Sequence, residues 1–382
     1  MQFLHAKKLP LSTQLIGVDG GATRVRACEV EVLGAPIEVR LRAGPRGAER
    51  EYKRIDGFET PAELGLSEPE QLGEIQPRER EQGWAWIEAT AQCVLEVSRR
   101  RDAKNVLLGL AMPGLKTADG RGLAFARNGP RIPEFAERLT ELLVCEGVEL
   151  AAPIGELLGD GWCAGVGETW GEGGALHGWR TAYYLGGGTG LAEALVLGGE
   201  LVPLLDVGEW FPPAWRCLVA DSRVEDLLSA RAINQRWAER AGFETPLERG
   251  RFPEDHVLRD FRAQELLDGV GRTLAEFVSR RALLLAQHSA DEPEHPGPHV
   301  LERIVLGQRL GELFADPRTH EHLRRAFEAE LGTRLHRLGL DELLPPGGGK
   351  PWRDLTRSSV IPQSVALGAA ACALAEWSRA HA

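Results

Sequence analysis

The pattern of apolar and polar positions predicts two strand pairs, each folded around a glycine-rich turn. Residues 17–23 read GVDGGAT and residues 186–190 read GGGTG. A short apolar run precedes each turn and another follows it, so the pattern predicts strand, tight turn, strand, twice in one chain. The first pair is predicted as a β-hairpin over residues 12–34.

The stretch after the first hairpin alternates between predicted helices and buried strands. Residues 36–83 are charged and contain several Gly and Pro residues, which indicates one more strand and a long surface excursion. Beyond them, helical spacing of apolar residues predicts helices, and continuous apolar runs predict buried strands. The helices are expected at 84–101, 133–145 and 160–168, and the strands at 105–112 and 148–154.

The second half repeats this order. A hairpin is predicted over residues 194–202 around Gly198 and Gly199, and Gly347 to Lys350 is interpreted as a loop. Helices are expected at 223–240, 261–288, 319–331 and 361–381, with a buried strand at 303–307. The repeated order of strands and helices indicates an internally duplicated α/β unit.

Composition and charge narrow the class of protein. The 382 residues are 43% hydrophobic and 26% charged, which is typical of a globular protein with room for two domains. A net charge of −11 argues against nucleic-acid binding through the phosphate backbone. Without a signal-peptide pattern or an apolar run of about 20 residues, we expect no membrane partner and a cytoplasmic location. The six cysteines are scattered, so neither a disulfide framework nor a cysteine-based zinc site is expected.

Both glycine-rich turns are candidate phosphate sites, because a turn without β-carbons lets backbone N–H groups approach an anion closely. In the first turn, Asp19 precedes Gly20 and Gly21, and Thr23 follows. The Asp19 carboxylate suits a Mg²⁺ ion held through water, while the turn and the Thr23 hydroxyl suit phosphate oxygens. The alternative is an ordinary Asp-Gly-Gly hairpin turn.

The second turn offers Gly187, Gly188, Thr189 and Gly190 in the same strand-turn-strand context. Two such turns together predict a nucleotide phosphate site. Neither turn matches a P-loop, and neither opens a helix as a dinucleotide-binding G-x-G-x-x-G does.

Asp160 is the candidate general base. It lies between the predicted strand at 148–154 and an apolar helix, and Gly159 precedes it. A carboxylate there suits accepting the proton of a hydroxyl that attacks a γ-phosphate. The alternative is that Asp160 is the N-cap of the helix.

Taken together, these motifs resemble the ROK family of sugar kinases within the actin-like ATPase superfamily. The resemblance extends over most of the chain. Besides the two glycine turns it rests on segments that match the family in order and spacing. These segments are 108–114 (LGLAMPG), 122–128 (GLAFARN), 159–161 (GDG) with 167–168 (GE), 198–199 (GG), 224–229 (VEDLLS), 304–307 (IVLG) and 368–370 (GAA).

The resemblance implies a fold and a set of site residues. The fold would be α/β, with duplicated actin-like (ribonuclease H-like) domains around a central cleft. The smaller domain would hold residues 1–128 and the final helix at about 362–382, and the larger would hold 129–361. Asn128 and Glu225, with Asp206 or Glu209, would bind the sugar, whereas Gly307 and Gly368 would line the adenosine pocket.

The implied activity is ATP-dependent phosphorylation of a hydroxyl on a hexose or N-acyl-hexosamine-like sugar, with Mg²⁺ and with Asp160 as the base. The expected partners are that small sugar and, in a homodimer, a second copy of the chain. The alternatives are a catalytically degenerate protein that binds sugar or nucleotide, and an ATPase of the 2-hydroxyacyl-CoA dehydratase activator type.

The chain also departs from the family pattern. Gly159 stands where the family has Asn before its catalytic Asp, and residues 206–209 read DVGE where it has Glu-x-Gly-His. Cys217 is the only cysteine of the region where the family carries a cysteine-rich zinc motif. One thiolate cannot make a tetrahedral zinc site, so no zinc is expected and the identity of the sugar stays open.

Overall fold

The computed structural model describes residues 9–10, 12–34, 39–66, 68–99, 105–244, 250–291, 299–341 and 355–381. The loop interpreted at Gly347 to Lys350 lies outside these ranges. Internal contacts divide the chain into two compact units. Unit 1 comprises residues 1–174 and 361–382, and unit 2 comprises residues 175–360.

Unit 1 is built on a five-stranded mixed sheet of order β3-β2-β1-β4-β7. β3, β2 and β1 form an antiparallel meander, whereas β4 pairs in parallel with β1, and β7 in parallel with β4. The strands are β1 (Thr13–Gly20), β2 (Arg24–Leu33), β3 (Arg40–Glu51), β4 (Asn105–Ala111), β7 (Glu149–Leu150), and a separate hairpin of β5 (Leu115–Lys116) and β6 (Leu123–Phe125). The helices are α1 (Pro77–Arg99), α2 (Phe135–Cys145), α3 (Asp160–Trp170) and α11 (Ser364–Ala380), with a 3₁₀ turn at Pro69–Gln71.

Unit 2 repeats the plan with a sheet of order β10-β9-β8-β13-β14. Again a three-stranded antiparallel meander is extended by two parallel strands. Its strands are β8 (Ala182–Gly187), β9 (Leu191–Leu197), β10 (Glu200–Val202), β13 (Arg303–Gly307), β14 (Thr356–Ser358), and the hairpin of β11 (Leu218–Val219) and β12 (Ser222–Arg223). Its helices are α4 (Glu225–Leu228), α5 (Ala230–Ala241), α6 (Pro253–His256), α7 (Phe261–Asp291), α8 (Gln308–Ala315), a π turn at His320–Arg324 and α9 (Arg325–Arg337), with 3₁₀ turns at Ala214–Arg216 and Pro317–Thr319.

The two sheets confirm the predicted α/β class and its duplication. Both hairpins around the glycine turns are present, and β4 is the buried parallel strand expected from its continuous apolar run. The predicted strand at 148–154 is shorter, with only Glu149–Leu150 in the sheet before Pro153. The predicted helix at 223–240 is interrupted, because Ser229 adopts an extended conformation and caps α5 by accepting a hydrogen bond from the Ala232 N–H.

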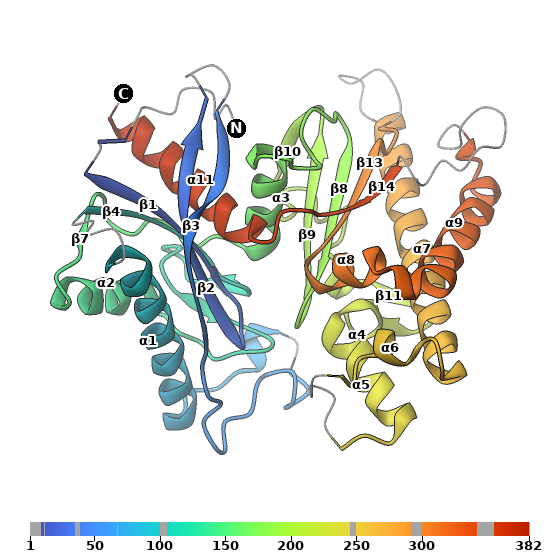
Figure 1. The fold of residues 1–382 in the computed structure, drawn as a ribbon, viewed down its shortest axis with the longest axis horizontal. Helices are drawn as coiled ribbons and strands as arrows, with labels where there is room; N and C mark the ends of the chain where they lie inside the picture. The colour runs from blue at the N-terminus through green and yellow to red at the C-terminus, as the bar shows by residue number, and fades with distance from the viewer. Residues whose placement is uncertain are drawn as a thin grey trace. The chain divides into compact units, whose positions relative to one another are not determined.

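The last helix returns to the first unit. Figure 1 shows α11, in red, beside the blue strands of the first sheet, where it contacts β1, β4 and α3. Glycines permit this close approach: a β-carbon on Gly17 or Gly109 would lie about 2 Å from the carbonyl oxygen of Ala366 or Ala369. The opposite face of the sheet packs its apolar side chains against α1 and α2. Unit 1 is therefore a three-layer α/β/α structure closed by the end of the chain.

Residues 129–174 pack into unit 1. β7 pairs with β4, and α3 lies against α11. The compact unit therefore extends past residue 128, where the expected smaller domain ended.

Candidate functional site

Asp19 and Asp160 lie at the same edge of the first sheet. Asp19 is next to last in β1, and its Cα partner on the parallel strand β4 is Ala111. Ala111 in turn forms a parallel bridge with Leu158, two residues before Asp160 opens α3. Three neighbouring chain segments thus bring both carboxylates to the edge where β1 and β4 end.

Burial and like charge disfavour the ionised form of Asp19. Its side chain is half-buried beside the Asp160 carboxylate. Burial, followed by the negative charge of Asp160, raises the pKa of Asp19 to about 7, although the Arg26 guanidinium acts in the opposite direction. Arg26 is itself bound to Glu49, with 2.6 Å between Nε and Oε2. The site therefore has an excess of negative charge that a bound cation would relieve.

Asp160 is the first residue of α3, and it is not the N-cap. The N-cap position belongs to Gly159, and Oδ1 of Asp160 accepts a hydrogen bond of 2.9 Å from the N–H of Gly161. Burial raises the pKa of Asp160, whereas the Lys116 ammonium and the Gly161 N–H lower it. The capping alternative thus does not explain this carboxylate, which stays available for chemistry.

The glycines of the first turn are required by close packing. A β-carbon on Gly20 would lie 2.0 Å from the sulfur of Met112, and one on Gly21 would lie 2.8 Å from the carbonyl oxygen of Arg24. The hydroxyl of Tyr52 donates to the carbonyl oxygens of Gly21 and Ala22 and holds the turn from the β3 side. Thr23 is exposed at its tip.

The second glycine turn is fixed by side chains from outside the hairpin. Within the turn, the N–H of Gly188 donates to the carbonyl oxygen of Gly190 at 2.9 Å. Arg231 donates from its backbone N–H to Gly188 at 3.2 Å and from Nε to the Thr189 carbonyl at 3.1 Å. The buried Glu225 accepts the N–H of Leu191 at 3.2 Å. Glu225 therefore supports the backbone of this turn.

The expected sugar-binding residues differ in how deeply they are buried. Asn128 is half-buried in unit 1, in the turn after β6. Asp206 and Glu209 are exposed in the segment after β10, whereas Glu225 is buried at the glycine turn of the same unit. Their sugar-binding roles stay predictions.

Two glycines predicted for the adenosine pocket lie at points of close contact. A β-carbon on Gly368 would lie 1.8 Å from the carbonyl oxygen of Cys163, at the crossing of α11 and α3. A β-carbon on Gly307 would lie 2.1 Å from the hydroxyl of Tyr184. Packing accounts for both glycines, and their contact with adenosine stays a prediction.

Sequence reasoning missed Lys116 and Gln308. Lys116 follows Pro113-Gly114 without belonging to any recognised motif. An isolated lysine just beyond a buried strand could nevertheless have been proposed as a candidate site residue. Gln308 has a φ of +54°, in the left-handed region that favours glycine, and its Oε1 lies 3.0 Å from where a β-carbon of Gly188 would be. No local signal marks a glutamine for this conformation.

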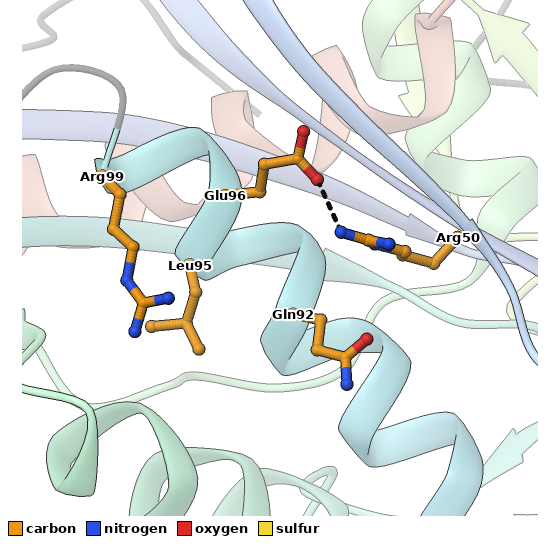
Figure 2. A pocket seen from close by; sticks show the side chains of 5 residues that line it. All are labelled: Arg50, Gln92, Leu95, Glu96 and Arg99. Atoms are coloured by element: carbon orange, nitrogen blue, oxygen red, sulfur yellow. Dashed lines mark hydrogen bonds and ion pairs between the residues drawn. The ribbon is translucent and has the colours of Figure 1, made fainter.

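Figure 2 shows a different hollow, of about 380 Å³, on the α1 side of unit 1. It is lined by Arg50, Gln92, Leu95, Glu96 and Arg99. Arg50 is paired with Glu96 at 3.0 Å, and Arg99 is paired with Glu146. Both cations are thus already neutralised, and the hollow contains none of the predicted site residues.

No protein-family model matches the chain, and no curated protein sequence does. Solved structures do match it over nearly its full length. The ROK hexokinase from Thermus thermophilus is 19% identical with a TM-score of 0.53, over 95% of this chain and 99% of that one. The ROK family glucokinase from Streptomyces griseus, in complex with glucose and AMPPNP, is 18% identical with a TM-score of 0.52, over 94% and 98%.

A ROK family transcriptional regulator, described as a homolog of the E. coli MLC protein, is also similar. It is 13% identical with a TM-score of 0.54, over 96% of this chain and 79% of that one. Identities this low establish likeness of fold. The chain therefore has the mixed α/β, actin-like fold of the ROK sugar kinases, as its sequence motifs predict.

Proposed function

We propose that this protein transfers the γ-phosphoryl group of ATP to a hydroxyl of a sugar. The observation that carries the proposal is the pair of half-buried carboxylates, Asp19 and Asp160, at one strand edge of unit 1. Two neighbouring carboxylates that are partly removed from water cost stability, which is typical of a functional site. The likeness to sugar kinases, one of them solved with glucose and AMPPNP, supports the same reaction.

In this proposal Asp160 is the general base. Its carboxylate accepts the proton of the sugar hydroxyl as the hydroxyl oxygen attacks phosphorus. The Gly161 N–H and the Lys116 ammonium favour the ionised form that a base requires. Because phosphoryl transfer needs little covalent chemistry from a protein, the remaining residues bind and orient the reactants.

Asp19 fits a magnesium ion. The cation that acts on the half-buried Asp19, Arg26, is itself paired with Glu49, so this carboxylate keeps a raised pKa. Mg²⁺ takes one or two carboxylates and completes its shell with water and phosphate oxygens. Within the described part of the chain no group of three or more His, Cys, Asp or Glu is placed to hold a metal, so an all-protein cage is not available there. Bound at Asp19, the ion would neutralise phosphate charge.

The remaining roles follow the sequence predictions. The turn residues Gly20, Gly21 and Thr23 bind phosphate oxygens. In unit 2 the same role falls to Gly187, Gly188, Thr189 and Gly190. Asn128, Asp206, Glu209 and Glu225 are the proposed sugar-binding residues, and Gly307 and Gly368 the proposed adenosine contacts.

Asp160→Asn tests the central claim. With a panel of sugars, ATP and Mg²⁺, ADP release by the variant should fall by about 100- to 10,000-fold, because the general base is lost. Its affinity for ATP, measured by calorimetry, should change little. Asp56→Asn, at an exposed carboxylate of the same unit, is the matched control and should keep full activity. Full activity of Asp160→Asn would remove this residue from the mechanism.

A second candidate is a protein that binds sugar without phosphorylating it. The likeness to a transcriptional regulator favours this alternative, as do the departures at Gly159 and residues 206–209. A sugar that raises the melting temperature without any ADP release in the presence of ATP and Mg²⁺ would support it. Sugar-dependent ADP release would exclude it.

No helix among the described residues is both long and apolar enough to cross a bilayer.

A further inference from the structure

Lys116 holds its ammonium group at the strand edge that carries the two carboxylates. Nζ donates to the carbonyl oxygens of Met112 and Gly114, each at 2.7 Å. Met112 directly follows Ala111, the Cα partner of Asp19, and its N–H donates to Leu158 at 2.8 Å. The ammonium is therefore anchored to the backbone that links the end of β1 with the approach to α3.

The charges around Lys116 are those of the site. Burial lowers the pKa of Lys116 to about 8, whereas the Asp160 carboxylate, and the thiolate form of Cys163 in α3, favour the ammonium form. Asp160 also faces Asp19 from β1, and Asp19 faces Arg26 from β2 and Glu49 from β3. Lys116 is thus the cation that acts directly on Asp160.

A site that receives a phosphoryl group beside two carboxylates needs a fixed positive charge, because the incoming group is itself anionic. Arg26 does not provide this fixed positive charge well, because it is paired with Glu49 at 2.6 Å and its side chain is 40% exposed. Lys116 is better placed. Two of its three N–H groups bind carbonyl oxygens, which leaves the third for an acceptor that arrives with the substrate.

We propose that Lys116 is a further catalytic residue, whose ammonium group binds the phosphoryl group as that group reaches the acceptor hydroxyl. The role rests on the proposed phosphoryl transfer. The ammonium stabilises negative charge on the phosphoryl oxygens, whereas Asp160 accepts the hydroxyl proton. No bond to Lys116 forms or breaks.

Kinetics of Lys116→Met, with Lys53→Met as the matched control at an exposed lysine of the same unit, provide the first test. Removal of the cation should lower kcat by about 100-fold or more and leave the KM for the sugar nearly unchanged, because the contact forms in the transition state. Lys116→Arg keeps the charge, so its kcat should be at least about tenfold higher than that of Lys116→Met. Wild-type kcat in a folded Lys116→Met would overturn the proposal.

The second test does not need an active enzyme. The protein is acetylated with acetic anhydride at a series of pH values, and the modified lysines are quantified by mass spectrometry. Lys116 should react at lower pH in Asp160→Asn than in the wild type, because the negative charge of Asp160 no longer favours the ammonium form. Inorganic phosphate should protect Lys116 but not Lys53. The role of Lys116 would be overturned if its labelling were the same with and without phosphate and the same in the wild type and Asp160→Asn.

The two tests separate the proposals. Failure of the wild type to phosphorylate any sugar would remove the proposed function, whereas phosphate protection of Lys116 would still establish the anion contact. Activity in the wild type with no effect of Lys116→Met would retain the function and reject the role of Lys116.

Discussion

Each unit contains a cluster of buried charge, but the two clusters are compensated very differently. In unit 2, Glu193 of β9 and Arg281 of α7 are almost fully buried and form an ion pair of 2.8 Å. The Tyr183 hydroxyl and the Ala214 N–H donate to the same carboxylate, and the guanidinium lies 4.3 Å from the centre of the Phe211 ring. In unit 1, by contrast, the Asp160 carboxylate disfavours the ionised form of its neighbour Asp19.

This difference separates a structural cluster from a functional one. A buried carboxylate that has a cation and hydrogen-bond donors holds elements together, here β9, α7 and the segment around Ala214. Two carboxylates that face each other at a strand edge repel one another, and that cost is typical of sites that bind charged ligands. Substitutions in each cluster test this comparison.

Arg281→Met should have the largest effect on stability. It leaves Glu193 buried without its cation and should lower the free energy of unfolding by about 3–5 kcal/mol. Urea unfolding followed by circular dichroism measures the change. Arg280→Met, which breaks the exposed neighbouring pair with Glu276, should cost less than about 1 kcal/mol.

Glu193→Gln added to Arg281→Met removes the uncompensated charge and should recover part of the loss, because the amide oxygen still accepts from Ala214. If the double variant were no more stable than Arg281→Met, the ion pair would not be the reason for the loss.

Asp19→Asn, in contrast, should raise the free energy of unfolding at alkaline pH. The pKa of Asp19 is about 7 in the folded protein and near 4 in an unfolded chain, so between these pH values the folded state binds the extra proton. Stability contributed by this group is therefore present at pH 4 and is lost as the pH rises through 7. The variant avoids this loss and, with partial exposure taken into account, should be more stable than the wild type by about 1–2 kcal/mol at pH 8.

At pH 4 the difference between Asp19→Asn and the wild type should shrink to less than about 0.5 kcal/mol, because Asp19 is then protonated in the folded state and about half protonated in the unfolded chain. Urea unfolding at pH 4 and pH 8 without divalent cations measures both values, with Asp56→Asn as the control. An equal difference at both pH values would show that charge is not the cause.

Gln308→Gly should produce the smallest change. The left-handed backbone of Gln308 costs roughly 1–3 kcal/mol. Glycine removes this strain, but its greater freedom in the unfolded chain offsets part of the gain in stability. We expect a net stabilisation of about 0.5–1 kcal/mol in thermal unfolding, and no gain for Gln308→Ala, which keeps the same backbone conformation. Equal stability of the two variants would mean that the backbone of Gln308 is not strained.

The sequence alone predicts most of the secondary structure, because the signals for it are local. The hairpins around Asp19 and Thr189 and the strand at 105–111 follow from apolar periodicity and glycine placement. The interruption at Ser229 does not, since its cap competes with a helical pattern that runs through it. The two glycine turns and Asp160 are likewise readable as candidates because each follows a predicted strand.

Only the tertiary structure brings Asp19 next to Asp160, adds Lys116 to them and pairs Glu193 with Arg281, which lie 88 residues apart. These contacts depend on which strands become neighbours in a sheet and on which side chains are removed from water together. A linear pattern of apolar and polar residues shows where a chain bends and what it buries. It does not show which charges meet once water is excluded, and that decides whether a carboxylate supports the fold or serves its function.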